Sequence, residues 1–439
     1  MLPLRNFIFH STFQLLLWLP ACLWCQSLSS LVRDADEAYQ KKEYHKAHEL
    51  YQSAIEKEAD DHALWFKYAE SARQINQYSE AEKYYTRILE SQDKFLFGMA
   101  RFWLGQIKKN LGKYEEAAEL FRDFSMLGLD DYYTYWSANE VQICNWAKDQ
   151  PSSCDYIQID LLDENINSYY SESGPIEMGN HLYYTSDRSI FSEDKHEPKR
   201  HLAKMMVSKN LERGRPVPNE FSKEGQHVGN TAFSHDWQRM YFTVCEFIND
   251  EDMRCEIYFR DQDENGNWMR ESTRLPDHIN KAGYTTTQPA IGYNPVTKTE
   301  TLYFVSDRPD GRGNLDLWYC TITKEGFSDP INLWEINTQE NEVTPSFHEA
   351  TQTFTFSSNG YRSFGGYDIF YCEKFGNEWD MAINMGMPIN SSYDDLYFSK
   401  NTTGNRAYFS SNRPGSLTPR SKYEGFSLDI YRVYYKMGE

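Results

Sequence analysis

"LYFVSDRPDGRGNLDLWYC", residues 302–320, is the stretch that decides the fold of the larger part of this chain. Taken alone, its Asp and Arg residues and two glycines after an apolar run are typical of an active-site loop. Related stretches recur, however: "LYYTSDR" at 182, "FTFSSNG" at 354, "AYFSSNR" at 407 and a weaker copy, "MYFTVCE", at 240. An active site is normally present once, so the repetition indicates a structural unit.

The central aromatic residues of these five copies lie 52 to 62 residues apart. Each copy is followed by a turn and a second β-rich run, such as "LDLWYC" at 315. Segments ending in Ile-Asn introduce the units: "ENIN" at 164, "DHIN" at 277, "WEIN" at 334 and "MPIN" at 387. A unit of this length with about four strands is the period of a propeller blade. We expect an all-β propeller over residues 154–439, of five blades, or six if the insertion at 189–225 contains another.

The fifth unit ends at "LDIYRVYYK" without an outer strand, whereas an additional strand, "CDYIQIDLLDENIN" from Cys154, precedes the first unit. A ring of blades must close without leaving an exposed strand edge. We therefore expect the first strand of the domain to complete the last blade.

The Ser-Asp/Asn-Arg turn and the later Asp of each unit have a structural explanation, because such side chains hydrogen-bond turn backbone. Ser306 and Asp316 are ten residues apart, as are Ser358 and Asp368, which predicts a repeated hydrogen bond within the blade. The structural set is Ser306, Asp307, Arg308, Asp316, Ser358, Asn359, Asp368, Ser411, Asn412, Arg413 and Asp429. Asp310 and Arg312 are additional, at the tip of one turn, and are expected to contact a partner.

Residues 29–148 are predicted to be helical, with apolar residues at three- and four-residue spacing and no proline from 31 to 148. A longer period is also present. Tyr44, Ala47 and Tyr51 recur 34 residues later, and "Y-x-x-A-x-x-x-F" follows 36 residues after that, at 114–121. This predicts three helical pairs followed by a closing helix from Asp130 to Ala147.

The pattern closely resembles the tetratricopeptide repeat (TPR) family. The resemblance implies an α-solenoid whose concave groove binds peptides or proteins. By the family's register, the groove would be lined by Phe66, Glu70, Arg73, Phe102, Gln106 and Lys109.

The β-rich units resemble the WD40-like repeats of TolB-type propellers, on "F-S-S-N-R … D-I-Y". The order of export signal, TPR repeats and propeller is similar to the front of a family of outer-membrane-associated periplasmic proteins. That family includes a propeller lipoprotein of the type IX secretion (Por) system. Its members usually continue into an OmpA-like peptidoglycan-binding domain, and since this chain ends at Glu439, that anchoring function is not carried over. The resemblance implies envelope proteins, including type IX secretion components, as partners.

Residues 1–25 have the features of a secretory signal peptide, with an apolar core too short to span a bilayer. Cleavage after Cys25 and lipidation of Cys22 within "LPAC" are alternatives. Both lead to the periplasm or the periplasmic face of the outer membrane, with membrane attachment only through a lipid.

Six cysteines follow the signal peptide. Cys144 and Cys154 are ten residues apart, as are Cys245 and Cys255, so each pair is a candidate disulfide in an oxidising compartment. Two further cysteines, at 320 and 372, fall at the same place in two blades and are expected to be thiols.

The formal charge of −20 argues against nucleic acid as a partner. "DQDENGNW" at 261 partly matches a calcium loop, but its twelfth position is Ser272 and the stretch aligns with hairpin turns in other units. No catalytic motif is found. We expect no enzyme, metal or cofactor, and a scaffold that binds partner proteins. The alternative is a ligand- or glycan-sensing propeller, or a hydrolase that uses carboxylates of the propeller channel.

Overall fold

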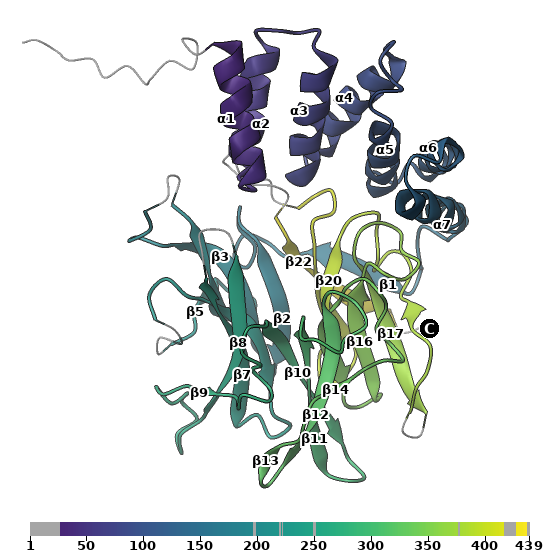
Figure 1. The fold of residues 1–439 in the computed structure, drawn as a ribbon. Helices are drawn as coiled ribbons and strands as arrows, with labels where there is room; N and C mark the ends of the chain where they lie inside the picture. Colours follow the sequence, from purple (N-terminus) through teal and green to yellow (C-terminus); the bar gives the residue numbers. More distant parts are fainter. Residues whose placement is uncertain are drawn as a thin grey trace, which may run out of the picture.

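The computed structural model describes residues 27–195, 199–218, 221, 223–248, 252–375, 378–416 and 427–436. Within them, seven helices precede five small antiparallel sheets (Figure 1). The expected signal peptide, with Cys22, lies outside the described residues. No helix among those described has the length and apolar character needed to cross a membrane.

The helices form three antiparallel pairs and a closing helix, as the repeat pattern predicts. They are α1 (Leu28–Gln40), α2 (Tyr44–Ile55), α3 (His62–Gln74), α4 (Tyr78–Glu90), α5 (Met99–Asn110), α6 (Tyr114–Leu127) and α7 (Asp131–Lys148). We call this part the solenoid.

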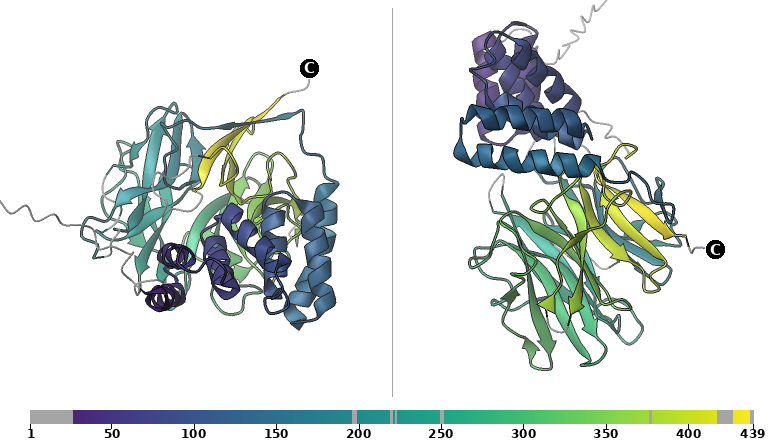
Figure 2. Two further views of the ribbon diagram at one scale, coloured as in Figure 1. Left: turned by 90° about the horizontal axis from the view of Figure 1, so that it is seen from above. Right: turned by 90° about the vertical axis from the view of Figure 1, so that its right-hand side faces the viewer.

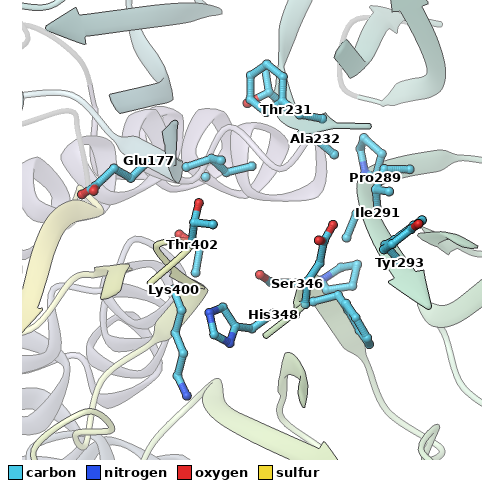
Figure 3. Close-up of a pocket in the computed structure, with 18 of the residues that line it drawn as sticks. Glu177, Thr231, Ala232, Pro289, Ile291, Tyr293, Ser346, His348, Lys400 and Thr402 are labelled. Atoms are coloured by element: carbon cyan, nitrogen blue, oxygen red, sulfur yellow. The ribbon is translucent and has the colours of Figure 1, made fainter. Parts of the chain in front are cut away.

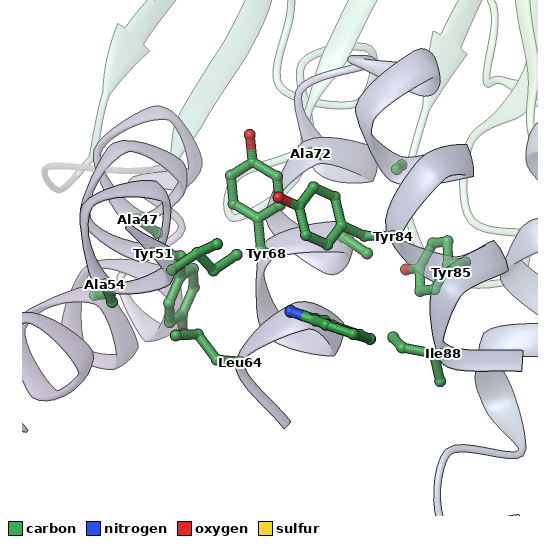
Figure 4. Close-up of a cluster of buried hydrophobic side chains, with 14 of the residues drawn as sticks. Ala47, Tyr51, Ala54, Leu64, Tyr68, Ala72, Tyr84, Tyr85 and Ile88 are labelled. Atoms are coloured by element: carbon green, nitrogen blue, oxygen red, sulfur yellow. The ribbon is translucent and has the colours of Figure 1, made fainter. Parts of the chain in front are cut away.

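The repeated residues build the core of the solenoid (Figure 4). Ala47 and Ala81 have no exposed surface, and Tyr51 and Tyr85 are 2% exposed or less. Small residues let the paired helices approach closely: a Cβ added to Gly105 would lie 2.9 Å from the ring of Phe121. The residues that recur every 34 to 36 positions are therefore the ones that pack between the paired helices.

The strands form five blades around a central axis, and the six-blade alternative is wrong because the insertion at 189–225 supplies strands of the first blade. The first two blades are β2 (Glu172–Met178), β3 (His181–Ile190), β4 (His201–Lys209) and β5 (Arg215–Pro216), then β6 (His227–Phe233), β7 (Arg239–Phe247), β8 (Met253–Asp261) and β9 (Thr273–Arg274). The third is β10 (Thr286–Asn294), β11 (Thr299–Ser306), β12 (Asp316–Thr323), β13 (Gly326–Phe327) and β14 (Ile331–Asn332). The fourth is β15 (Glu342–His348), β16 (Thr353–Ser358), β17 (Asp368–Phe375), β18 (Glu378–Trp379) and β19 (Ile383–Asn384), and the fifth is β20 (Asp395–Lys400), β21 (Arg406–Ser411), β22 (Asp429–Tyr435) and β1 (Ile157–Leu161).

The ring closes as expected from the sequence. Strand β1, the first of the domain, pairs antiparallel with β22, the last, from Ile157 opposite Tyr435 to Leu161 opposite Tyr431. The last blade thus receives its outer strand from the start of the domain, which covers the edge of β22.

The asparagines that end the Ile-Asn segments hold the blades together. Asn337 accepts a hydrogen bond from the backbone N–H of Leu317 and donates one to its carbonyl, both at 2.9 Å. Asn167, Asn280 and Asn390 do the same to the third strands of three other blades. Each is at most 1% exposed. These amides give a partner to a buried backbone N–H group of the third strand and add a second hydrogen bond to its carbonyl, which also accepts the N–H of Leu162, Leu275, Leu333 or Met385.

The predicted Ser–Asp hydrogen bond is wrong in its partner, although the register is right. Ser306 lies directly opposite Asp316. The Ser306 hydroxyl nevertheless donates to the carbonyl of Thr285 at 2.6 Å, and Asp316 accepts from the backbone N–H of Gly313 at 2.9 Å. The ten-residue spacing sets the pairing across the hairpin, while each side chain bonds the loop on its own side.

In the second blade, a disulfide bond occupies the position that corresponds to Ser306 and Asp316 in the third blade. Cys245 lies directly opposite Cys255, as Ser306 lies opposite Asp316, and the two sulfurs are bonded. Cys144 and Cys154, the other candidate pair, are free, because Cys144 is buried in the core between α5, α6 and α7. The two cysteines opposite Leu302 and Phe354, at 320 and 372, are buried thiols.

Removing this disulfide with the double substitution Cys245→Ser/Cys255→Ser is expected to lower the free energy of unfolding by about 3 kcal/mol, since it closes a loop of roughly ten residues. Urea unfolding followed by tryptophan fluorescence measures the difference. Reductant should bring the wild-type protein to the stability of the variant and leave the variant unchanged. Equal effects of reductant on both proteins would contradict the assignment.

Candidate functional site

One edge of the solenoid rests on the propeller (Figure 2). Lys109 Nζ lies 3.4 Å from Ser363 Oγ, and the ring of Trp146 lies 4.8 Å from that of Phe364. At the turn between α5 and α6, a Cβ added to Gly112 would lie 3.5 Å from Ser392 Oγ. The turns within the repeats and helix α7 therefore form the contact with the fourth and fifth blades.

Two residues predicted to line the peptide groove are buried instead. Phe102 has no exposed surface and packs among Phe121, Phe124 and Trp136. Lys109 forms an ion pair of 2.9 Å with Glu140, and both side chains are at most 6% exposed. The prediction fails here because α7 covers Phe102 and the propeller covers Lys109, and neither contact is encoded in the repeat register.

The other four predicted groove residues are half-buried and remain candidates for partner contact. Glu70 forms an ion pair with Arg73 at 2.8 Å and also accepts the hydroxyl of Tyr85. The Arg73 guanidinium lies over the ring of Trp103, and Phe66 stacks on Phe97 at 5.4 Å. The charges of this face are thus neutralised within the chain.

Gln106 occupies the place of Glu70 in the next repeat, where Phe121 replaces Tyr85. The hydroxyl that would pair with it is therefore missing. The Gln106 amide nitrogen is buried without a hydrogen-bond partner among the described residues. Arg73 Nε is the other predicted groove atom that is buried without a hydrogen-bond partner among the described residues.

Sequence reasoning missed an apolar surface on the opposite edge of the solenoid. The connections α4–α5 and α6–α7 touch, since a Cβ added to Gly98 would lie 2.2 Å from Leu129 Cδ1. Large apolar side chains here are 38 to 78% exposed: Phe95, Leu96, Met126, Leu127 and Leu129. We call these five residues the apolar edge. Its signal in the sequence was the run of apolar residues in two turns.

The tip of the third-blade turn is exposed, and the partner contact expected of Asp310 and Arg312 stays a prediction. Asp310 has a left-handed backbone with φ of 69°. Arg312 donates from Nη1 to the carbonyl of Trp334 at 3.0 Å. One nitrogen of its guanidinium is therefore already hydrogen-bonded within the blade.

The remaining signature residues bind the loops of their own blades. Asp307 accepts the N–H of Thr285, and Arg308 donates to the carbonyl of His278, while burial lowers the pKa of Arg308 to about 10. Elsewhere, such bonds join Ser358 to Glu342, Asn359 to Asn341, Asp368 to Asn384, Asn412 to Asp394, Ser411 to Arg413 and Arg413 to Pro388, and Asp429 is fully buried opposite Ser411.

The stretch from residue 261 that partly matches a calcium loop forms a hairpin. Asp263 donates its N–H to the carbonyl of Asn267 at 2.8 Å, and its carboxylate accepts the N–H groups of Asn265 and Asn267. Its oxygens are thus used to stabilise the turn. Among the described residues, no cluster of three or more His, Cys, Asp or Glu side chains is arranged to hold a metal ion.

The central channel is lined by the inner strand of each blade, and each of these strands carries a bulge at the same level. The residue at each bulge has a left-handed backbone: Gly174, Asn230, Gln288, Thr344 and Tyr397. The side chain of Gln288 donates to the hydroxyl of Tyr397 at 3.1 Å and accepts the N–H of Thr344 at 2.7 Å. These bonds tie three blades together at the axis.

Beyond this level the channel widens into a cavity of about 560 Å³ (Figure 3). Residues from all five inner strands line it: Glu177, Thr231, Tyr293, Ser346, His348 and Lys400. The cavity lies on the side away from the solenoid, because β20 begins near Ser392 at the solenoid contact and ends at Lys400 in the cavity wall.

The two carboxylates of this wall, Glu177 and Glu349, are already paired. Glu177 lies 2.6 Å from Arg406 and accepts the hydroxyl of Tyr408, and Glu349 lies 2.8 Å from His235. Burial lowers the pKa of Lys400. Glycoside hydrolysis needs one carboxyl group as acid and another as base or nucleophile, and the two carboxylates of this lining are bound to Arg406 and to the imidazole of His235.

No protein-family model matches the sequence, and the search of curated proteins gave no match. Among solved structures, the helical part is similar to the TPR domain of Arabidopsis OM64, with 20% identity over 26% of this chain and 93% of that one and a TM-score of 0.24. The propeller is similar to a thermostable family-43 glycoside hydrolase, with 15% identity over 63% of this chain and 94% of that one and a TM-score of 0.39. An α-L-arabinofuranosidase from Lactobacillus brevis matches with 10% identity over 62% and 93% and a TM-score of 0.39. At such low similarity, none of the three bears on what this chain binds or catalyses.

Proposed function

We propose that the protein is a non-enzymatic scaffold that binds a partner protein through the apolar edge of its solenoid. The observation that carries the proposal is the orientation of the solenoid. One edge is fixed to the propeller through Lys109, Gly112 and Trp146, and the opposite edge presents large apolar side chains to solvent.

Contiguous exposed apolar side chains favour protein association, because covering them removes apolar surface from water. Phe95, Leu96 and Met126 are each at least 74% exposed. The paired charges at Glu70 and Arg73 favour a partner that binds by apolar contact over one held by charge.

The partner is an envelope protein, and the scaffold acts in the periplasm or on the periplasmic face of the outer membrane. Two features support this location: the signal-peptide pattern of residues 1–25, and the Cys245–Cys255 disulfide, which suits an oxidising compartment. The order of repeats resembles the type IX secretion propeller lipoprotein, so we place the partner among the components of such a secretion or gliding assembly.

Crosslinking of the tagged protein in envelope fractions, with quantitative mass spectrometry, tests this function. The double substitution Phe95→Glu/Leu96→Glu should reduce recovery of the partner at least tenfold. Met381→Glu is the matched control, because Met381 is 82% exposed on the fourth blade and lies far from the apolar edge in sequence and domain. Recovery of no envelope protein by the wild type, or equal recovery by both variants, would contradict the proposal.

A further inference from the structure

The cavity at the end of the propeller channel is a separate site, formed without any residue of the solenoid. Its volume of about 560 Å³ falls in the range of small-molecule sites, roughly 300 to 1,000 Å³. Its walls include residues of the five inner strands as well as residues of loops. The bulged inner strands are fixed by bonds such as Gln288 to Tyr397 and Tyr397 to Thr344, so the site is formed before any ligand arrives.

The charge pairing of the wall excludes ions as the preferred ligand. An anion would need a free cation, but Arg406 is bound to Glu177 and the imidazole of His235 to Glu349, while Lys400 points its ammonium group away from the cavity (Figure 3), over the ring of Tyr435 at 5.8 Å. A cation would need a free carboxylate, and these two are the carboxylates of the lining. Breaking the Glu177–Arg406 pair to bind a charged ligand would leave the carboxylate of Glu177, whose side chain is 10% exposed, without its cation.

A purely apolar ligand fits no better. Each of β2, β6, β10, β15 and β20 is the end strand of its sheet, so one edge of its backbone N–H and C=O groups faces the channel. Ser346 and Thr402 add hydroxyl groups. The hydroxyl of Thr231, a residue only 4% exposed, has no hydrogen-bond partner among the described residues. An apolar ligand would displace water from these polar groups without offering them hydrogen bonds, which costs free energy.

The wall also offers flat ring faces and prolines. Tyr293 stacks on His235 with 3.6 Å between ring centres, and Pro289 and Pro345 follow the bulge residues of two adjacent inner strands. A ligand that suits this wall is uncharged, carries many hydroxyl groups and has an apolar ring face. These are the properties of a neutral sugar, whose C–H face packs on aromatic rings while its hydroxyls exchange hydrogen bonds with the wall.

We propose that the channel cavity binds a short neutral saccharide, with a sugar ring against Tyr293 and its hydroxyls toward Ser346, Thr402 and the exposed edges of the inner strands. A peptide end is disfavoured, since it carries a charge that no free group here matches. The scaffold would then recognise a glycan on one face and a protein on its solenoid.

Saturation-transfer NMR with the full mature chain tests the site, using maltotriose, cellotriose, xylotriose and tri-N-acetylchitotriose, with trigalacturonate and a neutral tripeptide amide as comparison probes. At least one neutral trisaccharide should bind, and more tightly than either comparison probe. Absence of signal from all four at millimolar concentration, or stronger binding of trigalacturonate or of the peptide, would overturn the proposal.

Two variants locate the binding. Tyr293→Ala removes the ring face, and Ser346→Phe fills the cavity; each should weaken binding of the trisaccharide at least tenfold. Val296→Ala is the matched control, because Val296 is 89% exposed close to Tyr293 and does not line the cavity. Unchanged binding by Tyr293→Ala, in a protein whose thermal unfolding matches the wild type, would refute the site. Phe95→Glu/Leu96→Glu should leave the binding intact, which separates this result from the proposed scaffold function.

Discussion

Replacing Lys109 by alanine is expected to lower the free energy of unfolding by about 3–5 kcal/mol, because it leaves the buried carboxylate of Glu140 without its cation. The two side chains are 4% and 6% exposed and lie 2.9 Å apart, at the contact between solenoid and propeller. Trp136 donates to the other oxygen of Glu140 at 3.1 Å, which alone does not compensate a full charge. Urea unfolding measures the loss.

Lys41→Ala is the matched control. Lys41 and Glu37 form an ion pair at 2.8 Å on the surface of α1, with side chains 55% and 62% exposed, and such pairs contribute about 0–1 kcal/mol. The double substitution Lys109→Met/Glu140→Gln should recover much of the loss, since no charge remains buried. A loss for Lys109→Ala as small as that for Lys41→Ala would show that this pair is open to water and that the docking is looser than described.

The second large effect is expected for Asn337→Ala. The substitution leaves the backbone N–H of Leu317 without a partner in the core of the third blade, whereas the carbonyl of Leu317 keeps the N–H of Leu333 at 3.0 Å; one buried group without its partner costs about 1–3 kcal/mol. Asn337 itself has no exposed surface, so water cannot replace the amide without opening the blade.

Asn314→Ala, in the same blade, is the control because the side chain of Asn314 is exposed, and a change within about 0.5 kcal/mol is expected there. Urea unfolding of both variants, followed by far-UV circular dichroism, distinguishes them. If Asn337→Ala and Asn314→Ala were equally stable, the Ile-Asn segments would not hold the blades as we describe.

The repeat architecture was predictable because the residues that create it recur at fixed distances. The spacing of Tyr44, Ala47 and Tyr51 marks helices that pack alike, and the missing outer strand of the last unit pointed to closure by residues 157–161. The spacing of two residues along the sequence indicates which residues face each other across a hairpin, but it does not indicate which atoms form hydrogen bonds. The predicted bond between Ser306 and Asp316 failed for that reason: the residues face each other, while their polar atoms bond separate loops.

The candidate sites were largely not predictable, because they depend on contacts between distant parts of the chain. Glu177 and Arg406, which neutralise each other at the cavity, are separated by 229 residues. The burial of Lys109 results from docking of the solenoid on the propeller, which no repeat register contains. Phe95 and Leu129 belong to different connections, and only the packing of Gly98 against Leu129 brings them to one surface.

Site-specific photo-crosslinking in intact cells tests the central claim most directly. A photoreactive amino acid is placed at position 96, in the apolar edge, or at position 381, an equally exposed site on the fourth blade. The account predicts one abundant adduct with an envelope protein from position 96 and no such adduct from position 381. No adduct from position 96, or the same adduct in equal yield from both positions, would contradict a scaffold that binds its partner through the apolar edge of the solenoid.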